Sequence, residues 1–307
     1  MNEPFYSFAT YLKGKFPGSK VLKIPINAGF SCPNRDGTLS SAGCVFCDPF
    51  AAGPMATAGW TIEDQITSFI RRHPGRRFIA YFQSHCNTHG PVAELSSRYE
   101  IVFRFPEIVG LSVGTRPDEL PEPALSLLQE TGRCIYLSVE LGLQSVHERS
   151  LGLLNRNHTV TQFEAVFHEL RRRSIDVVVH LIVGIPGETR ADMRATIEVM
   201  NALKPAGIKF HPLHVLRGAP LQAWHARGSL PLLGRDEYIH IICDLLERLD
   251  PDIVIHRLTA DREKDLFIAP LWMLDKAAVL EAIRREMRQR KSRQGCRRKE
   301  AAFSTTR

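Results

Sequence analysis

The sequence predicts an α/β protein built on a partial (βα)6 TIM-type barrel of parallel strands, with a small C-terminal α/β extension. Strand-like and helix-like stretches alternate from about residue 20 to residue 215, which is the pattern of parallel βα units. Residues 176–183 are almost entirely apolar, as in a strand that is buried on both faces. The most distinctive polar and glycine-rich motifs follow the predicted strands, where α/β folds place their functional sites.

Six stretches have the β-branched, aromatic and apolar composition that is typical of strands. They are residues 20–27, 77–83, 108–114, 134–141, 176–183 and 207–215. Six βα units favour a partial barrel over an open doubly wound sheet, although both arrangements share this pattern.

Helical stretches separate these strands. Thr61 and Asp64 form a capping box, and apolar residues then recur at helical spacing. Pro91 suits the start of the second helix, and Gly132 suits the end of the third. The predicted helices cover residues 62–70, 91–104, 121–131, 145–173 with a break near 155–160, and 189–203.

The chain of 307 residues divides into four predicted segments. These are an N-terminal segment (1–19), the barrel (20–217), a C-terminal extension packed on the barrel (218–283) and a basic, disordered tail (284–307). The tail contains ten Lys or Arg and two Glu, so the rest of the chain is nearly neutral although the net charge is +7. A solvated tail is expected from this composition, and weak, non-specific binding of RNA is the alternative.

The composition also predicts a cytoplasmic protein without a membrane partner. No apolar run reaches the ~18 to 20 residues that cross a bilayer, and the polar N-terminus does not resemble a signal peptide. The seven cysteines form no regular framework, which argues against a disulfide scaffold. The sequence leaves the oligomeric state open.

Three cysteines lie close together directly after the first predicted strand, in the stretch GFSCPNRDGTLSSAGCVFCD. Cys32, Cys44 and Cys47 have the spacing C-x11-C-x2-C, which is typical of thiolates that hold a metal ion or a cluster. A closed iron–sulfur cluster takes four thiolates, so three would leave one iron open to a small molecule. The alternatives are a structural zinc site that borrows a histidine, and surface cysteines with no shared role.

The cysteine motifs GFSCPNRDGT and GCVFC are accompanied by other motifs. These are YFQS, VGTRPD, ELGLQS, LNRNHT, HLIVGIPGE, KFHPLHVLRG and APLW. With the six-fold repeat, they resemble the radical S-adenosylmethionine (SAM) superfamily over about residues 20–275. The commonest cysteine spacing there is C-x3-C-x2-C, and the longer first gap of this chain resembles the branch that contains the Elongator catalytic subunit. The motifs resemble most those of the YhcC-type bacterial proteins.

The resemblance implies a 4Fe-4S cluster held by Cys32, Cys44 and Cys47, with SAM bound at its open iron. One electron would cleave SAM to methionine and a 5′-deoxyadenosyl radical, which would remove a hydrogen atom from a substrate. A low-potential donor such as flavodoxin or ferredoxin would supply the electron. The Elongator branch suggests tRNA as the substrate, and a small metabolite or a protein is an equal alternative.

The resemblance also implies several contacts with SAM. Phe46 lies where family members place an aromatic residue near the adenine, and a hydrophobic shield for the cluster is the alternative. Gln83 and Ser84 replace the Gly-Gly-Glu-like segment that binds the SAM amino group, so that contact would use the backbone. Gln144 matches a polar residue that binds the ribose.

Two further positions follow the same motifs. Arg156 matches the arginine that pairs with the SAM carboxylate, for which a guanidinium fork is well suited; an arginine on a helix surface is the alternative. Gly184 lies in the loop after the fifth strand, where backbone groups contact the adenine.

Polar residues near the predicted barrel mouth are candidates for contact with the substrate. His211, His214 and His256 are the candidates, although a single histidine is more often structural. Glu140 is predicted to be buried, either in an internal salt bridge, for example with Arg116, or in contact with the ligand. The sequence does not identify a catalytic residue.

Two other functions are compatible with part of the sequence. A zinc-stabilised nucleic-acid-binding protein would use the basic tail, but this hypothesis leaves Gln144, Arg156 and the six-fold repeat unexplained. A protein that binds the cluster and SAM without turnover is the second alternative, and the complete set of motifs gives it no positive support.

Overall fold

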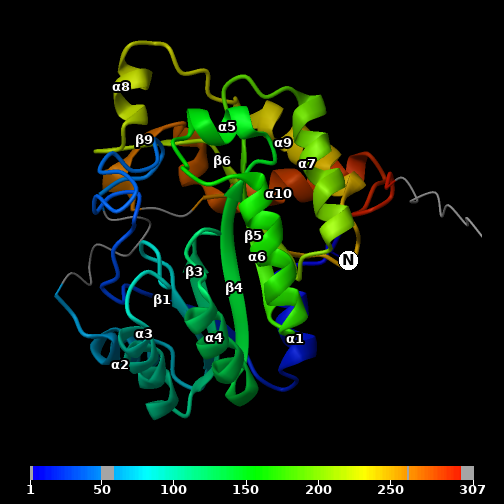
Figure 1. The fold of residues 1–307 in the computed structure, drawn as a ribbon. Coiled ribbons are helices and arrows are strands. Elements are labelled where there is room, and N and C mark those ends of the chain that lie inside the picture. The colour runs from blue at the N-terminus through cyan, green and yellow to red at the C-terminus, as the bar shows by residue number, and fades with distance from the viewer. Residues whose placement is uncertain (1–2, 50–58, 261–262, 299–307) are drawn as a thin grey trace, which may run out of the picture.

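A curled, parallel seven-stranded sheet forms the centre of the molecule, with helices on its outer face (Figure 1). The computed structural model describes residues 3–49, 59–260 and 263–298. The strands are β1 (Val21–Ile26), β2 (Arg77–Phe82), β3 (Ile108–Thr115), β4 (Tyr136–Gln144), β5 (Asp176–Val183), β6 (Gly207–Pro212) and β8 (Val254–Arg257), in this order across the sheet. The predicted α/β partial barrel is therefore confirmed.

The sheet has one strand more than the sequence predicted. β8 comes from the C-terminal extension and pairs in parallel with β6, for example Gly207 with Val254. Its four residues were too short to be assigned to the barrel by pattern alone. The extension thus completes the half-barrel instead of only packing on it.

The α-helices of the described residues are α1 (Phe8–Lys15), α2 (Ile62–Arg72), α3 (Val92–Glu100), α4 (Glu122–Cys134), α5 (Glu148–Leu153), α6 (Val160–Arg172), α7 (Arg190–Leu203), α8 (Leu221–Ala226), α9 (Arg235–Arg248) and α10 (Lys276–Gln289). Helices α2 to α7 agree closely with the predicted ones, whereas α1 and α8 were not predicted. The capping box of Thr61 and Asp64 is present, and the break between α5 and α6 lies where it was expected. Gly132 does not end α4, because the helix continues to Cys134 before β4 begins.

The main core lies between the sheet and these helices. Its largest fully buried side chains include Phe78 and Phe82 of β2, Phe163 and Phe167 of α6, and Tyr238 of α9. Burying each such side chain contributes on the order of 2 kcal/mol. This packing fixes the strands and thereby the positions of the loops at their C-terminal ends.

The prediction of a disordered tail is wrong for residues 284–298. Met287 and Ile283 of α10 are fully buried with Val279, because apolar residues four apart form a buried stripe beneath the basic exposed face. Beyond the helix, Gln294 Nε2 donates hydrogen bonds to the carbonyl oxygens of Asp250 and Ile253, at 2.7 and 2.9 Å. The rest of the predicted tail, residues 299–307, lies outside the described residues.

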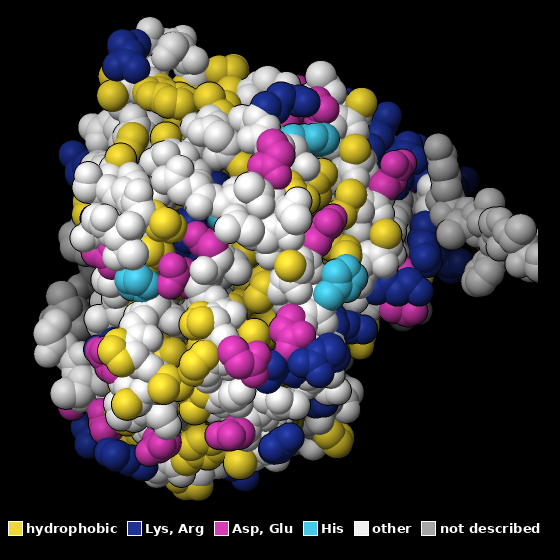
Figure 2. Space-filling view, viewed as in Figure 1, with side chains coloured by type: hydrophobic (Ala, Val, Ile, Leu, Met, Phe, Trp, Pro, Cys, Tyr) yellow, Lys and Arg dark blue, Asp and Glu magenta, His cyan; other side chains and the backbone are white. Residues whose placement is uncertain are grey.

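Charged side chains of both signs are interspersed over the face shown in Figure 2, and basic groups gather beside the C-terminal end. No helix within the described part of the chain has the length and apolar character needed to cross a membrane.

Candidate functional site

The cysteine-rich loop lies over the C-terminal ends of the strands, next to α8 and a small second sheet of β7 (Val215–Leu216) and β9 (Phe267–Ala269) (Figure 1). Val45, between two of the cysteines, anchors it through its backbone. Its N–H donates to the carbonyl of Leu154 at 3.1 Å, and its carbonyl accepts from the N–H of Leu221 at 2.9 Å. The Val45 side chain packs in an apolar cluster with Ile182 and Leu213. The loop is therefore tied to the barrel mouth from both sides.

Three asparagines connect the cysteine loop to the segment between α5 and α6. Asn34 is fully buried; its Nδ2 donates to the carbonyl of Asn155 at 2.7 Å, and its Oδ1 accepts from Asn157 Nδ2 at 2.6 Å. Asn155 Nδ2 in turn donates to the carbonyl of Gly43 at 2.6 Å. Asn155 and Asn157 have φ values of 51° and 52°, a left-handed conformation that asparagine tolerates better than most residues. These contacts hold the GFSCPN and LNRNHT motifs together.

The three cysteine thiols differ in their surroundings. Cys44 is buried, and its Sγ lies 3.1 Å from Arg156 Nη1 and 3.4 Å from Asn34 Nδ2. Burial raises the pKa of the Cys44 thiol, but Arg156 and Asn34 outweigh this effect, so the pKa is below its ordinary value. Burial raises the pKa of Cys47 to about 12 and also raises that of Cys32. Cys44 is thus the thiol that ionises most readily.

Arg156 lies beside the cysteine loop with its donors already engaged. In addition to the Cys44 sulfur, its Nη2 donates to the carbonyl of Gly142 at 2.6 Å, and its Nε donates to His158 Nε2 at 3.2 Å. Burial and the charge of Arg156 lower the pKa of His158 to about 3, which keeps this imidazole neutral and able to accept. Arg156 is therefore buried and not a residue of the helix surface.

Several buried polar atoms beside the loop lack a partner among the described residues. They include the Ser84 Oγ atom, His85 Nδ1 and Arg116 Nη1. The other nitrogens of Arg116 donate to Asp118 and to the carbonyl of Arg156, and Arg116 also lowers the pKa of Cys44. Buried polar groups without partners are uncommon and destabilising. Unsatisfied donors beside three cysteines fit a site that receives a polar, anionic group.

A cavity of about 160 Å³ lies below the cysteine loop, inside the barrel mouth. Its lining residues are Phe46, Cys47, Asp48, Tyr81, Gln83, Gln144, His180, Ile182, His211, Pro212, Leu213, His214, Leu216, Arg257 and Ala260. The structure thus brings five of the predicted cofactor and substrate residues to one cavity: Phe46, Gln83, Gln144, His211 and His214.

Gln144 has a backbone conformation that is unusual for its residue type. Its φ is 75°, and the register of β4 with β5 shifts between Leu141 and Gln144. A buried non-glycine residue in the left-handed region is strained, and such strain is common at functional sites. The shift turns the Gln144 side chain toward the cavity.

The remaining predicted residues lie nearby but do not line the cavity. Gly184 has a φ of 88°, and a side chain there would collide with Leu233, at 2.7 Å. The His256 ring stacks on Phe8 of α1, with centroids 4.0 Å apart. Ser84 is buried beside the loop. The roles predicted for these residues remain predictions.

The prediction that Glu140 pairs with Arg116 is wrong. Arg116 pairs with Asp118, whereas Glu140 Oε1 accepts from Lys23 Nζ at 2.6 Å. Glu140 Oε2 accepts from His180 Nε2 at 2.7 Å and from Lys209 Nζ. These side chains come from four different strands and meet inside the barrel, a proximity that sequence separation does not reveal.

Sequence reasoning also missed several residues of the site. Asn34 and Asn157 had a usable signal, because both lie inside motifs that were quoted. Arg257 was not missed: it follows the candidate His256 on a short strand that the sequence indicates, and the structure brings Arg257, but not His256, to the cavity lining.

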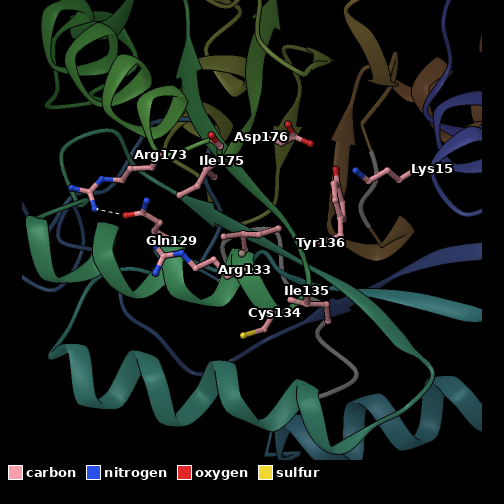
Figure 3. A pocket seen from close by; sticks show the side chains of 12 residues that line it. Lys15, Gln129, Arg133, Cys134, Ile135, Tyr136, Arg173, Ile175 and Asp176 are labelled. Atoms are coloured by element: carbon pink, nitrogen blue, oxygen red, sulfur yellow. Dashed lines mark hydrogen bonds between the residues drawn. The ribbon is translucent and has the colours of Figure 1, made fainter.

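A second hollow, of about 620 Å³, lies at the opposite end of the barrel (Figure 3). It is lined by the first residues of β4 and β5 and by the ends of α1, α4 and α6, including Gln129, Arg133 and Arg173. Arg173 Nη1 donates to Gln129 Oε1 at 3.2 Å, and its Nη2 pairs with Glu122 at 2.7 Å. These are ordinary surface contacts.

The fold and the cysteine site together define a radical SAM protein. Residues 31–200 match the Radical SAM superfamily, and residues 205–289 match the Radical_SAM C-terminal domain. The chain belongs to the radical SAM superfamily, which confirms the resemblance found in the sequence.

Individual relatives agree with this assignment. The chain is 40% identical over 298 residues to the uncharacterized protein YtqA of Bacillus subtilis, covering 95% of this chain and 92% of the relative. It is 36% identical over 262 residues to the protein YhcC of Escherichia coli K12, covering 83% of each.

The fold is similar to that of a solved archaeal Elp3, from Methanocaldococcus infernus, with an N-terminal deletion. The TM-score is 0.66 at 17% identity, over 90% of this chain and 64% of that one. Radical SAM enzymes use a 4Fe-4S cluster and SAM, so the chain is an enzyme of a family defined by these cofactors. Family membership disfavours the zinc-stabilised nucleic-acid-binding alternative.

Proposed function

We propose that Cys32, Cys44 and Cys47 hold one 4Fe-4S cluster, and that the enzyme reductively cleaves SAM to a 5′-deoxyadenosyl radical for hydrogen abstraction from a substrate. The observation that carries this proposal is the position of the three cysteines at the barrel mouth, above a cavity and beside buried donors without partners. The described residues contain no group of three His, Cys, Asp or Glu that could hold a single metal ion.

The cluster, when bound, supplies the electron that breaks the sulfonium bond of SAM. The protein residues prepare the surroundings for this step. Arg156 and Asn34 donate toward the Cys44 sulfur, and such hydrogen bonds tune the potential of a thiolate-bound cluster. Phe46, Ile182 and Leu213 give the cavity an apolar wall that limits the access of water to a reactive intermediate.

The SAM contacts remain part of the proposal. Gln144 and Gln83 present side-chain amides to the cavity, and Phe46 supplies an aromatic surface for the adenine. Arg116 Nη1 is a buried donor for the SAM carboxylate and supplements the predicted role of Arg156, whose own donors are already engaged.

The substrate and the electron donor are proposed from the resemblance and from the charge of the chain, and not from the geometry of the site. tRNA is supported by the resemblance to the Elongator branch and by the basic residues near the C-terminus. A flavodoxin or a ferredoxin is the proposed electron donor.

The experiment is anaerobic reconstitution with iron and sulfide, followed by addition of dithionite and SAM. We expect about four irons per chain and the formation of 5′-deoxyadenosine, measured by chromatography. Arg156→Ala should suppress 5′-deoxyadenosine. The matched control, Arg173→Ala, removes an arginine whose side chain is only 7% exposed at the opposite end of the barrel, and it should not suppress 5′-deoxyadenosine.

Each outcome has a defined meaning. A four-iron cluster without 5′-deoxyadenosine, even with bulk tRNA present, would favour a protein that binds the cofactors without turnover. Bound zinc and no iron–sulfur absorbance would contradict the cofactor assignment for this chain.

A further inference from the structure

The inside of the barrel carries more positive than negative side chains at the level just below the cavity. Lys209 of β6 is in register with Arg257 of β8 and with His180 of β5. Lys23 of β1 reaches the same level through Glu140. This layer therefore holds three basic side chains and one carboxylate among the described residues, and Lys23 and Lys209 are the two that pair with that carboxylate.

Lys23 and Lys209 are held in place by both the acid and an aromatic ring. Both bind Glu140. Their ammonium groups also lie over the ring of Tyr81, at 4.9 and 4.2 Å from its centroid. Burial, with Lys23 and Arg257 nearby, holds the pKa of Lys209 well below its ordinary value although Glu140 opposes this effect. One carboxylate thus does not offset the cationic surroundings.

Arg257 is the cation of this layer that lines the cavity. Its Nη2 lies 3.3 Å from His211 Nδ1, and its Nε is buried without a partner. No described carboxylate forms an ion pair with this guanidinium. Arg257 is half-buried, and its buried Nε is unsatisfied until an acceptor binds to it, for which an anion is well suited.

The rest of the lining determines the direction of a bound molecule. The acidic lining residue, Asp48, lies on the cysteine loop, and Ile182 and Leu213 give the same lining apolar side chains. An anionic group of a substrate is therefore favoured at Arg257 over a position beside the Asp48 carboxylate.

We infer that Arg257, together with His211, binds a carboxylate or phosphate group of the substrate, and that Lys209 and Lys23 add a favourable electrostatic field. An oxyanion at this position would accept from the unused Nε and relieve the excess positive charge. The inference rests on the proposed function, because it assigns this part of the cavity to the substrate of that reaction. It places the carbon that loses hydrogen between the anionic group and the cysteine loop.

Small anions test the subsite directly on the reconstituted, oxidised holoenzyme. Acetate and methylphosphonate represent the carboxylate and the phosphate, and acetamide is the uncharged counterpart of acetate. Saturation-transfer NMR of their methyl protons detects weak binding and gives a dissociation constant by titration. We expect at least one of the two anions to bind, and acetamide not to compete with it. The anion that binds more tightly then indicates whether the substrate group is a carboxylate or a phosphate.

Variants locate the binding. Arg257→Gln should weaken binding of the preferred anion by about tenfold or more, because a charge-assisted hydrogen bond is lost. Arg257→Lys keeps the positive charge and should retain part of the affinity. It is used instead of Arg257→Gln if Arg257→Gln does not fold. Arg133→Gln removes the same charge from the exposed, opposite end of the barrel and should bind as the unmodified enzyme does.

The inference is overturned if neither anion binds, if acetamide competes equally, or if Arg257→Gln binds as tightly as Arg133→Gln. Iron content and 5′-deoxyadenosine are measured on the same samples and judge the proposed function separately. Anion binding that depends on Arg257 in a protein that forms no 5′-deoxyadenosine would leave the subsite standing and remove the proposed reaction.

Discussion

The two ends of the barrel differ in whether their buried polar groups already have hydrogen-bond or ion-pair partners, and this difference matters more than the sizes of their hollows. The hollow at the start of the strands is about 620 Å³, and the cavity at the mouth is about 160 Å³. At the first, Arg173 is paired with Glu122 and Glu169, and it donates to Gln129 (Figure 3). At the second, Arg257 and Arg116 keep buried donors without partners among the described residues.

This difference shows which end is suited to bind a ligand. A surface recess whose charges are already paired gains little from a ligand, because exposed pairs are also well solvated. A buried donor without a partner is unfavourable until a ligand supplies the acceptor. The smaller cavity is therefore the better candidate, and its position agrees with the rule that α/β barrels place sites at the C-terminal ends of their strands.

The largest effect should come from removing a cysteine at the mouth. Cys44→Ala should abolish the cluster, measured as iron content and visible absorbance, and with it the cleavage of SAM. Cys243→Ala removes another buried thiol, which lies beneath α10 near the carbonyl of Ile283, and should retain both. Cluster-dependent cleavage in Cys44→Ala would refute the ligand assignment.

The second largest effect should come from removing the carboxylate of Glu140, which pairs with Lys23 and Lys209 below the cavity. Glu140→Gln leaves Lys23 and Lys209 without their acid and should lower the free energy of unfolding at pH 7 by about 3 to 5 kcal/mol. Urea unfolding measures this change. Glu169→Gln, which removes an exposed carboxylate at the opposite end, is the matched control and should have a much smaller effect.

The pH dependence of the stability lost in Glu140→Gln tests whether the buried carboxylate is charged in the folded protein. Burial raises the pKa of Glu140, but Lys209 and Lys23 outweigh burial and hold it well below its ordinary value. A lowered folded-state pKa contributes stability above the unfolded value of about 4.3, and this stability is lost as pH falls through the folded pKa. The difference between the unmodified protein and Glu140→Gln should therefore be complete at pH 7 and shrink below about pH 4. A constant difference would show that the pKa of Glu140 is the same in the folded and the unfolded protein.

A smaller effect is expected from the asparagine contacts at the mouth. Asn34→Ala removes hydrogen bonds to Asn155 and Asn157 and should destabilise the protein by about 2 kcal/mol. It should also lower iron incorporation, because the cysteine loop loses its attachment.

The control for this effect is Asn201→Ala. Asn201 also donates to one backbone carbonyl, that of Arg248, but it accepts from a backbone N–H, that of Asp250, where Asn34 accepts from the side chain of Asn157. The Asn201→Ala variant should be destabilised to a similar degree as Asn34→Ala, and its iron content should be unchanged. Equal iron losses in the two variants would mean that general stability, and not the loop attachment, controls loading.

The smallest effect should come from the hollow at the start of the strands. Arg133→Gln should change the free energy of unfolding by no more than about 0.5 kcal/mol, measured by urea unfolding, because it is an exposed substitution. Its iron content and 5′-deoxyadenosine formation should be unchanged. A clear loss of either would break the contrast between the two ends.

Much of the fold followed from local pattern. The apolar run of β5, the capping box at Thr61 and the break between α5 and α6 could be read along the chain, because each depends on residues within a few positions of one another. β8 could be predicted as a short strand over residues 253–258, but not its place in the sheet, because its pairing with β6 joins residues that are far apart in the sequence. The buried stripe of α10 was hidden by the basic residues around it.

For the site, the sequence identified what lies within one motif and missed what separate strands bring together. Cys32, Cys44 and Cys47 were found by spacing, and Gln144 by its place at the end of a strand. The pairing of Glu140 with Lys23 and Lys209 joins residues 117 and 69 positions away. No local rule connects them.

The sequence by itself determined the class of protein: the order of strands and helices, the cysteine loop after the first strand, and membership of the radical SAM superfamily. Only the tertiary structure decided which charges face each other inside the barrel, and that Arg257 reaches the cavity with no acidic partner in residues 3–49, 59–260 and 263–298. The physical reason is the register of parallel strands. It sets which inward-facing residues share a layer, and it depends on the packing of the whole sheet and not on any one segment.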